Sequence, residues 1–132
     1  MSDRQSITEK LAELTDGLLW MSEADYPWNV VSWDKPTVSP AELIQAAGRE
    51  PTASIQQKNP DDFFQRAVTE KEWQDASERE RVRRYRELVH FLKNNLADLT
   101  VYRIGEVEID TFVIGKTPSG TVAGIATTVV ET

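Results

Sequence analysis

Cysteine is absent from the 132 residues, and His90 is the one histidine. The first absence excludes disulfides and thiol chemistry, and the two together exclude the common zinc sites. Long apolar runs are also missing, since none approaches the roughly 20 residues that span a bilayer. The N-terminal residues 1–6 are polar and lack the apolar stretch of a signal peptide. These absences predict a cytoplasmic protein.

Positive charge is in deficit, with 15 lysines and arginines against 22 aspartates and glutamates and a net charge of −7. Such an acidic protein repels phosphate backbones, which disfavours direct binding to nucleic acid. A basic protein partner is favoured electrostatically, although acidity also serves solubility alone. The length suits a single domain, residues 1–132, with a core of its own.

Catalytic motifs are missing as well. The sequence has neither a glycine-rich phosphate loop nor a G-x-S-x-G nucleophile motif. His90 is expected on the polar face of a helix, without convergent partners. Glu106, Glu108 and Asp110 alternate along a predicted strand, which would place them on one face. We interpret that face as solvated surface or as a cation site with oxygen ligands. An enzyme is the least favoured class.

Helix-start signals recur along the first half of the chain. Ser6 and Glu9 have capping-box spacing, which predicts a helix from about residue 7 that ends at Asp-Gly, residues 16–17. Ser-Pro at residues 39–40 and Asn-Pro at residues 59–60 predict two short helices, because serine and asparagine cap helices and proline suits the first helical position.

Two further helix signals follow. A capping box spans residues 69–72, directly ahead of Trp73. The clearest helix of the chain covers about residues 77–96, because apolar side chains recur there every three or four residues and predict one buried face. The side chains of this stripe are Val82, Tyr85, Val89, Leu92 and Leu96.

Strand patterns cover residues 28–33, weakly residues 52–57, and most of the tail. Trp28 is predicted to lie in the core. Residues 101–115 and 121–130 are joined by a segment of hairpin-turn composition. Because helices precede this C-terminal β-hairpin, the order favours an α+β fold with helices packed on a mostly antiparallel sheet.

The register of this hairpin bears on the chain end. If Lys116 pairs with Thr121, Glu131 lies opposite Glu106. Like charges opposite one another cost stability. The end of the hairpin therefore either holds its carboxylates for an external cation or frays into solvent.

Two parts of the sequence resemble the nuclease A inhibitor family of cyanobacterial-type proteins. The first is Asp-Gly-Leu-Leu-Trp-Met-Ser-Glu at residues 16–23, with Tyr-Pro at residues 26–27, and the second is the tail from residue 101 to residue 132. Residues 62–64 fit too. The resemblance implies an α-β-α sandwich with a central sheet. It also implies inhibition of a sugar-nonspecific DNA/RNA endonuclease, a magnesium-dependent enzyme whose active site the inhibitor occludes.

The resemblance further implies site residues. Glu23 and Thr132 would approach the magnesium ion of the nuclease, and Trp73 would contact its surface. Neighbouring acidic groups would steer association with a basic cleft, and an aromatic side chain would anchor the contact. The predicted partner-binding residues are Glu23, Asp25, Tyr26, Trp73, Glu131 and Thr132.

The leading hypothesis is therefore a nuclease inhibitor, monomeric when free, that has no catalytic residue, cofactor or metal of its own. The alternative is an acidic interaction module with a partner other than a nuclease. The sequence departs from the family pattern near residues 24–29 and in residues 34–58. It also departs at Lys71, a basic residue that would face a basic cleft. These departures bear on which nuclease is bound.

Overall fold

The computed structural model describes residues 3–131, with side chains from residue 5 onward. These residues form four helices and seven strands, and the predicted α+β class is confirmed. The helices are α1 (Asp3–Thr15), α2 (Pro40–Ala46), α3 (Pro60–Phe64) and α4 (Ala76–Asn95). The strands are β1 (Leu19–Met21), β2 (Asp25–Pro27), β3 (Asn29–Trp33), β4 (Ile55–Lys58), β5 (Ala97–Ile104), β6 (Glu108–Lys116) and β7 (Val122–Val130).

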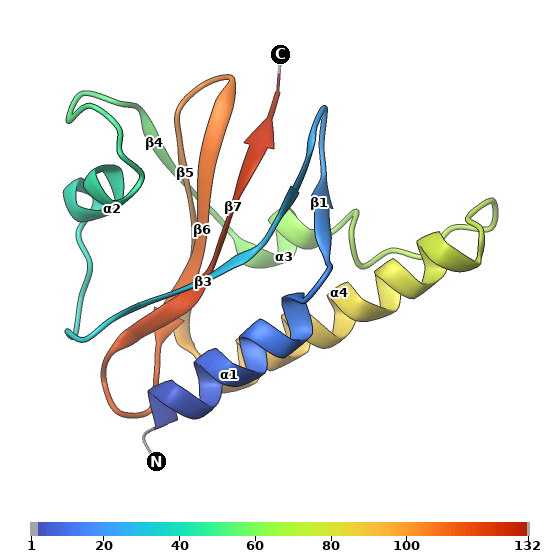
Figure 1. Cartoon of the computed structure of the whole chain (residues 1–132), viewed down its shortest axis with the longest axis horizontal. Coiled ribbons are helices and arrows are strands. Elements are labelled where there is room, and N and C mark those ends of the chain that lie inside the picture. Colours follow the sequence, from blue (N-terminus) through green and yellow to red (C-terminus); the bar gives the residue numbers. More distant parts are fainter. Residues whose placement is uncertain (1–2, 132) are drawn as a thin grey trace.

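Five of the strands in the described residues form one antiparallel sheet in the order β3-β7-β6-β5-β4 (Figure 1). Strands β5, β6 and β7 follow one another as a meander at its centre. The apolar, β-branched sequences of β6 and β7 suit strands that are covered on both faces. Strands β1 and β2 pair with each other in a short hairpin beside this sheet.

Helices cover both faces of the five-stranded sheet. Because side chains alternate along a strand, Val113 and Ile114 of β6 point to opposite faces. Val113 belongs to the larger core, which includes side chains of α1, α3 and α4, whereas Ile114 packs in a smaller core with α2. The helices and the sheet between them make the predicted α-β-α sandwich (Figure 1).

Two helix starts have the predicted caps, and the long helix has a cap that the sequence signals did not mark. Ser39 caps α2 in a capping box with Glu42, and Asn59 caps α3. The long helix α4 runs within one residue of its predicted bounds, and the side chain of Asp75 caps it by accepting a hydrogen bond from the amide of Glu78. A polar side chain at each start satisfies amides that lack a partner inside the helix.

Two capping-box predictions are wrong. Ser6 and Glu9 lie inside α1, which begins at Asp3. Residues 69–72 form no helix; instead the Thr69 hydroxyl donates to the Gln65 carbonyl over 2.6 Å. Short helices depend on burying an apolar face, and the segment after residue 69 offers little to bury.

The tail contains one more strand than predicted. Residues 101–115 are divided by a turn at residues 105–107, where Gly105 has a φ of +109°, a conformation that favours glycine. Glu106 lies in this turn, while Glu108 and Asp110 lie on β6. The predicted strand face of three carboxylates is therefore wrong.

The register of the last hairpin is one residue away from the prediction. The amide of Thr117 donates to the carbonyl of Thr121 over 2.8 Å, which closes the turn between them. Lys116 consequently pairs with Val122, and not with Thr121. The end of β7 is shifted by the same residue, because turn geometry sets the register of the whole hairpin.

Candidate protein-binding site at one end of the sheet

The β1–β2 hairpin presents an acidic turn. Met21 pairs with Asp25, and residues 22–24 form the turn between them. The hydroxyl of Ser22 donates to the carbonyl of Ala24 over 2.7 Å, so the turn is braced from within. Glu23 lies at its centre and is exposed.

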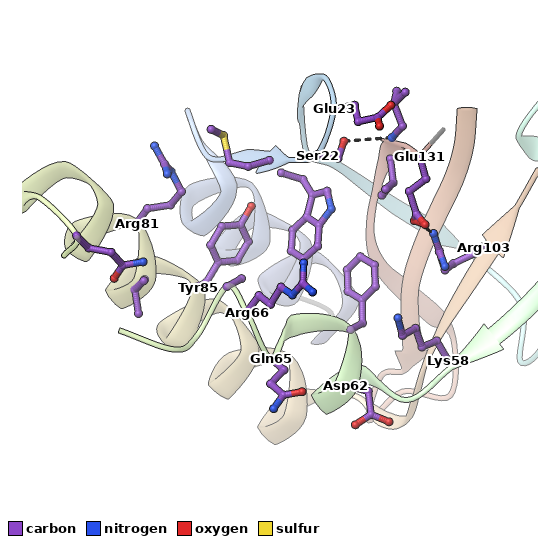
Figure 2. Close-up of a pocket in the computed structure, with 18 residues that line it drawn as sticks. Ser22, Glu23, Lys58, Asp62, Gln65, Arg66, Arg81, Tyr85, Arg103 and Glu131 are labelled. Atoms are coloured by element: carbon purple, nitrogen blue, oxygen red, sulfur yellow. Dashed lines mark hydrogen bonds and ion pairs between the residues drawn. The ribbon is translucent and has the colours of Figure 1, made fainter. Parts of the chain in front are cut away.

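The same turn is hydrogen-bonded to the end of β7. The amide of Val130 donates to the hydroxyl oxygen of Ser22 over 3.1 Å. In return, the amide of Glu23 donates to the carbonyl of Val130 over 3.3 Å. Figure 2 shows Ser22 and Glu23 beside Glu131. These bonds place two predicted acidic site residues, Glu23 and Glu131, next to each other.

The turn between β5 and β6 lies on the other side of β7. The amide of Glu131 donates to the carbonyl of Val107 over 3.0 Å. The end of β7 is thus held between two turns, as the upper part of Figure 1 shows. We call this surface the tip and define it as residues 21–25, 105–108 and 130–131.

The side chain of Glu131 is bound to Arg103 of β5. Nη2 of Arg103 donates to Oε2 of Glu131 in an ion pair, which Figure 2 shows. The side chain of Arg103 is 15% exposed and that of Glu131 53% exposed. The prediction that Glu131 lies opposite Glu106 is therefore wrong, because the register brings Val107 there and an arginine compensates the carboxylate.

Exposed apolar side chains occur at the tip. Within the described residues, four large hydrophobic side chains are exposed, and Met21 and Val107 of the tip are 49% and 51% exposed. Each adjoins one of the acidic groups, because Met21 precedes the turn that holds Glu23 and Val107 is hydrogen-bonded to Glu131. Exposed apolar side chains that cluster on a surface mark sites of protein interaction.

Tyr85 of α4 holds the base of the hairpin. Its hydroxyl donates to the carbonyl of Leu19 over 2.6 Å and accepts a hydrogen bond from Nε1 of Trp28 over 2.9 Å. Trp28 is buried in the core, as predicted. Burial raises the pKa of Tyr85 to about 12, so the phenol is neutral at physiological pH.

A cleft of about 810 Å³ adjoins the tip (Figure 2). Trp20 stacks on Phe63 at its floor, with 4.5 Å between ring centroids, and Tyr85 meets Trp20 edge-on. Charged side chains of both signs surround this aromatic floor, and the tip supplies acidic ones. These charged side chains are Glu23, Lys58, Asp62, Arg66, Arg81, Arg103 and Glu131.

A family model described as nuclease A inhibitor-like protein matches residues 5–132. The chain belongs to this family. A comparison with curated proteins finds no match. Membership supports a nuclease inhibitor role for the protein and a nuclease as its partner, and the resemblance stated from the sequence is confirmed.

The structure brings three of the predicted site residues together at the tip, namely Glu23, Asp25 and Glu131. Tyr26 lies elsewhere, half-buried in a smaller hollow that residues 46–47 at the end of α2 also line. Thr132 lies outside the described residues.

Trp73 lies in the loop between α3 and α4. It is 76% exposed, and Nζ of Lys71 lies 5.1 Å from its ring centroid. Its neighbour Gln74 lines the same cleft as Glu23 and Glu131. Trp73 is thus separate from the tip but close in sequence to the wall of the adjoining cleft.

Sequence reasoning missed the contacts that assemble the tip. The partner of Ser22 is Val130 and that of Glu131 is Arg103, and neither pairing has a local sequence signal. Within residues 5–131, no group of histidine, aspartate and glutamate side chains forms a metal site. None of the described helices is long and apolar enough to cross a membrane.

Proposed function

We propose that the protein inhibits a metal-dependent, sugar-nonspecific nuclease by inserting the tip into its active site. The observation that carries this proposal is the pair of hydrogen bonds between the hairpin turn and Val130. They hold Glu23 beside the end of β7, although the two segments are far apart in sequence. Two acidic groups on separate elements thus form one projecting surface.

The chemistry of such a nuclease suits this surface. Its site binds phosphodiesters and magnesium, so it is cationic, and carboxylate oxygens are the hard ligands that magnesium prefers. The net charge of −7 favours encounter with a basic cleft. In this proposal Glu23 and Thr132 approach the metal, and Met21 and Val107 contact the walls around it.

Inhibition by occlusion requires no reaction. We propose that the protein is not an enzyme, carries no cofactor, is a monomer when free and acts in the cytoplasm, where it protects the DNA and RNA of its host. Trp73 extends the contact beyond the tip, because an exposed tryptophan offers a large rigid surface at low entropic cost.

The test is a nuclease assay with purified protein and a magnesium-dependent nonspecific endonuclease from the same source. The wild type is expected to inhibit, and Glu23→Gln to weaken inhibition about tenfold or more. Glu87→Gln is the matched control, because Glu87 is an exposed glutamate of α4 outside the tip. A wild type that leaves the nuclease fully active would reject the proposal and favour the alternative of an acidic interaction module with another partner.

A further inference from the structure

The carboxylate of Glu131 already has a partner inside the protein. Arg103 and Glu131 both lie on the face of the sheet that α1, α3 and α4 cover, where Val101 and Val129 of the same strands are buried. Arg103 reaches across the intervening strand β6 to make the ion pair. A carboxylate held in this way is less available to an external cation than an unpaired one.

The arginine depends on this contact. Its side chain is 15% exposed, and its Nε is buried without a hydrogen-bond partner among the described residues. Glu131 is the one partner that the described residues offer to the guanidinium. Removing Glu131 would leave the mostly buried guanidinium of Arg103 without a compensating charge, so the position of Arg103 depends on the pair.

The backbone around Glu131 is held as well. Its amide is bonded to the carbonyl of Val107, and both backbone groups of Val130 are bonded to the hairpin turn. The ion pair adds a side-chain attachment to these backbone attachments. The end of β7 is therefore held through its backbone and through a side chain.

We propose that Arg103 and Glu131 form a positioning pair, in which Glu131 fixes the end of β7 beside the turn that presents Glu23 and does not itself contact the metal of the nuclease. This inference rests on the proposed function. It assigns a positioning role to Arg103, which the sequence did not single out. It also changes the role of Glu131 from a residue that contacts the nuclease to one that positions the end of β7. Because the ion pair is already formed in the free protein, it lowers the entropic cost of association.

Arg103→Gln distinguishes the two roles of Glu131. If the pair positions the chain, the loss of Arg103 is expected to weaken inhibition about tenfold, because Glu131 is released. If Glu131 acts directly on the metal, releasing its carboxylate leaves inhibition unchanged or stronger. An inhibition constant at or below that of the wild type would overturn the inference.

A double-mutant cycle makes the test quantitative. Arg103→Gln, Glu131→Gln and the double variant are expected to lose similar amounts of inhibition, since each removes the same pair. Losses that add in the double variant would show that the two residues act independently and would overturn the inference. Arg84→Gln is the matched control, because Arg84 is also a partly buried arginine but bonds the carbonyls of Leu14 and Asp16.

A measurement without the partner covers the case in which Arg103→Gln does not fold. In Glu131→Gln, whose changed side chain is 53% exposed, the amides of residues 130 and 131 are expected to show lower NMR order parameters than in the wild type. Unchanged order parameters would count against positioning. A wild type that fails to inhibit rejects both proposals, whereas inhibition by the wild type and by Arg103→Gln alike rejects only this one.

Discussion

The amide of Glu23 donates a hydrogen bond to the carbonyl of Val130 over 3.3 Å, while the amide of Val130 donates to the hydroxyl oxygen of Ser22. This reciprocal contact joins a turn near the start of the chain to the last strand of the sheet. Strands β1 and β2 form only a short two-stranded hairpin, so the contact supports the turn that presents Glu23.

Replacing Ser22 tests this contact. Ser22→Ala removes the acceptor for Val130 and the donor to Ala24, so we expect a loss of about 1–2 kcal/mol in the free energy of unfolding. Inhibition should weaken about tenfold, because Glu23 is no longer held in place. Ser77→Ala, at an exposed serine of α4, should change neither quantity. Denaturant titration and the nuclease assay measure the two effects, and unaltered inhibition by Ser22→Ala would show that the contact is dispensable.

Alkaline pH should destabilise the protein through Tyr85. Burial raises its pKa from 10.0 to about 12, against the smaller lowering effects of Trp28, Arg81 and Arg84. Between these values the unfolded chain binds fewer protons than the folded one, so stability falls as pH rises through this range. The full difference corresponds to about 2–3 kcal/mol.

Tyr85→Phe provides the control for this pH effect. The variant should be less stable than the wild type at pH 8, by about 1–3 kcal/mol, because Nε1 of Trp28 and the carbonyl of Leu19 lose their partner. Its stability should then fall less steeply between pH 10 and 12. Parallel curves for the two proteins in urea titrations would mean that Tyr85 does not cause the decline.

The apolar side chains of the tip should contribute to binding and little to stability. Met21→Gln with Val107→Thr removes apolar surface that is about half exposed, at 49% and 51%. We expect association with the nuclease to weaken by about 1–2 kcal/mol, with an unchanged melting temperature. Leu19→Gln, at the base of the same hairpin, serves as the matched exposed control. Equal affinity for the tip variant and the control would remove these side chains from the interface.

Trp73 should matter for binding alone. Because its side chain is 76% exposed, Trp73→Ala should leave the melting temperature unchanged but weaken inhibition about tenfold. A stable variant with full inhibition would place Trp73 outside the interface.

Lys71, which lies 5.1 Å from the ring of Trp73, should oppose association with a basic cleft. Lys71→Gln should therefore speed association at low salt, and the difference from the wild type should shrink as salt is added. Stopped-flow measurements across ionic strengths check this, and an association rate that falls in the variant would contradict a basic partner surface near Lys71.

The sequence predicts local features of this fold better than distant ones. The caps Ser39 and Asn59 mark α2 and α3 because the bonds that define them lie within a few residues. The same signal misleads at Ser6, which lies inside α1, and at Thr69, where no helix forms because the segment offers little apolar surface to bury. A capping signal in the sequence therefore marks some helix starts correctly but does not by itself show where a helix begins.

The candidate site shows the same limit. Glu23 and the end of the chain were predicted as site residues through the family resemblance, and the structure places Glu23 beside Glu131. The role of Arg103 could not be predicted, because it depends on a register that the turn from Thr117 to Thr121 shifts by one residue. A single residue in a turn thus changes which side chains meet more than ten residues away.

The β1–β2 hairpin is separate from the five-stranded sheet. It is attached to β7 by Val130 at its turn and by the hydroxyl of Thr127, which donates to the carbonyl of Pro27, and it is attached to helix α4 by Tyr85. A partner that binds the hairpin turn and the end of β7 together would add a further attachment between these two sheets. The β1–β2 hairpin, which presents the inhibitory carboxylate, would then be among the least stable elements of the free protein. Its local stability would increase more on binding than that of most other elements.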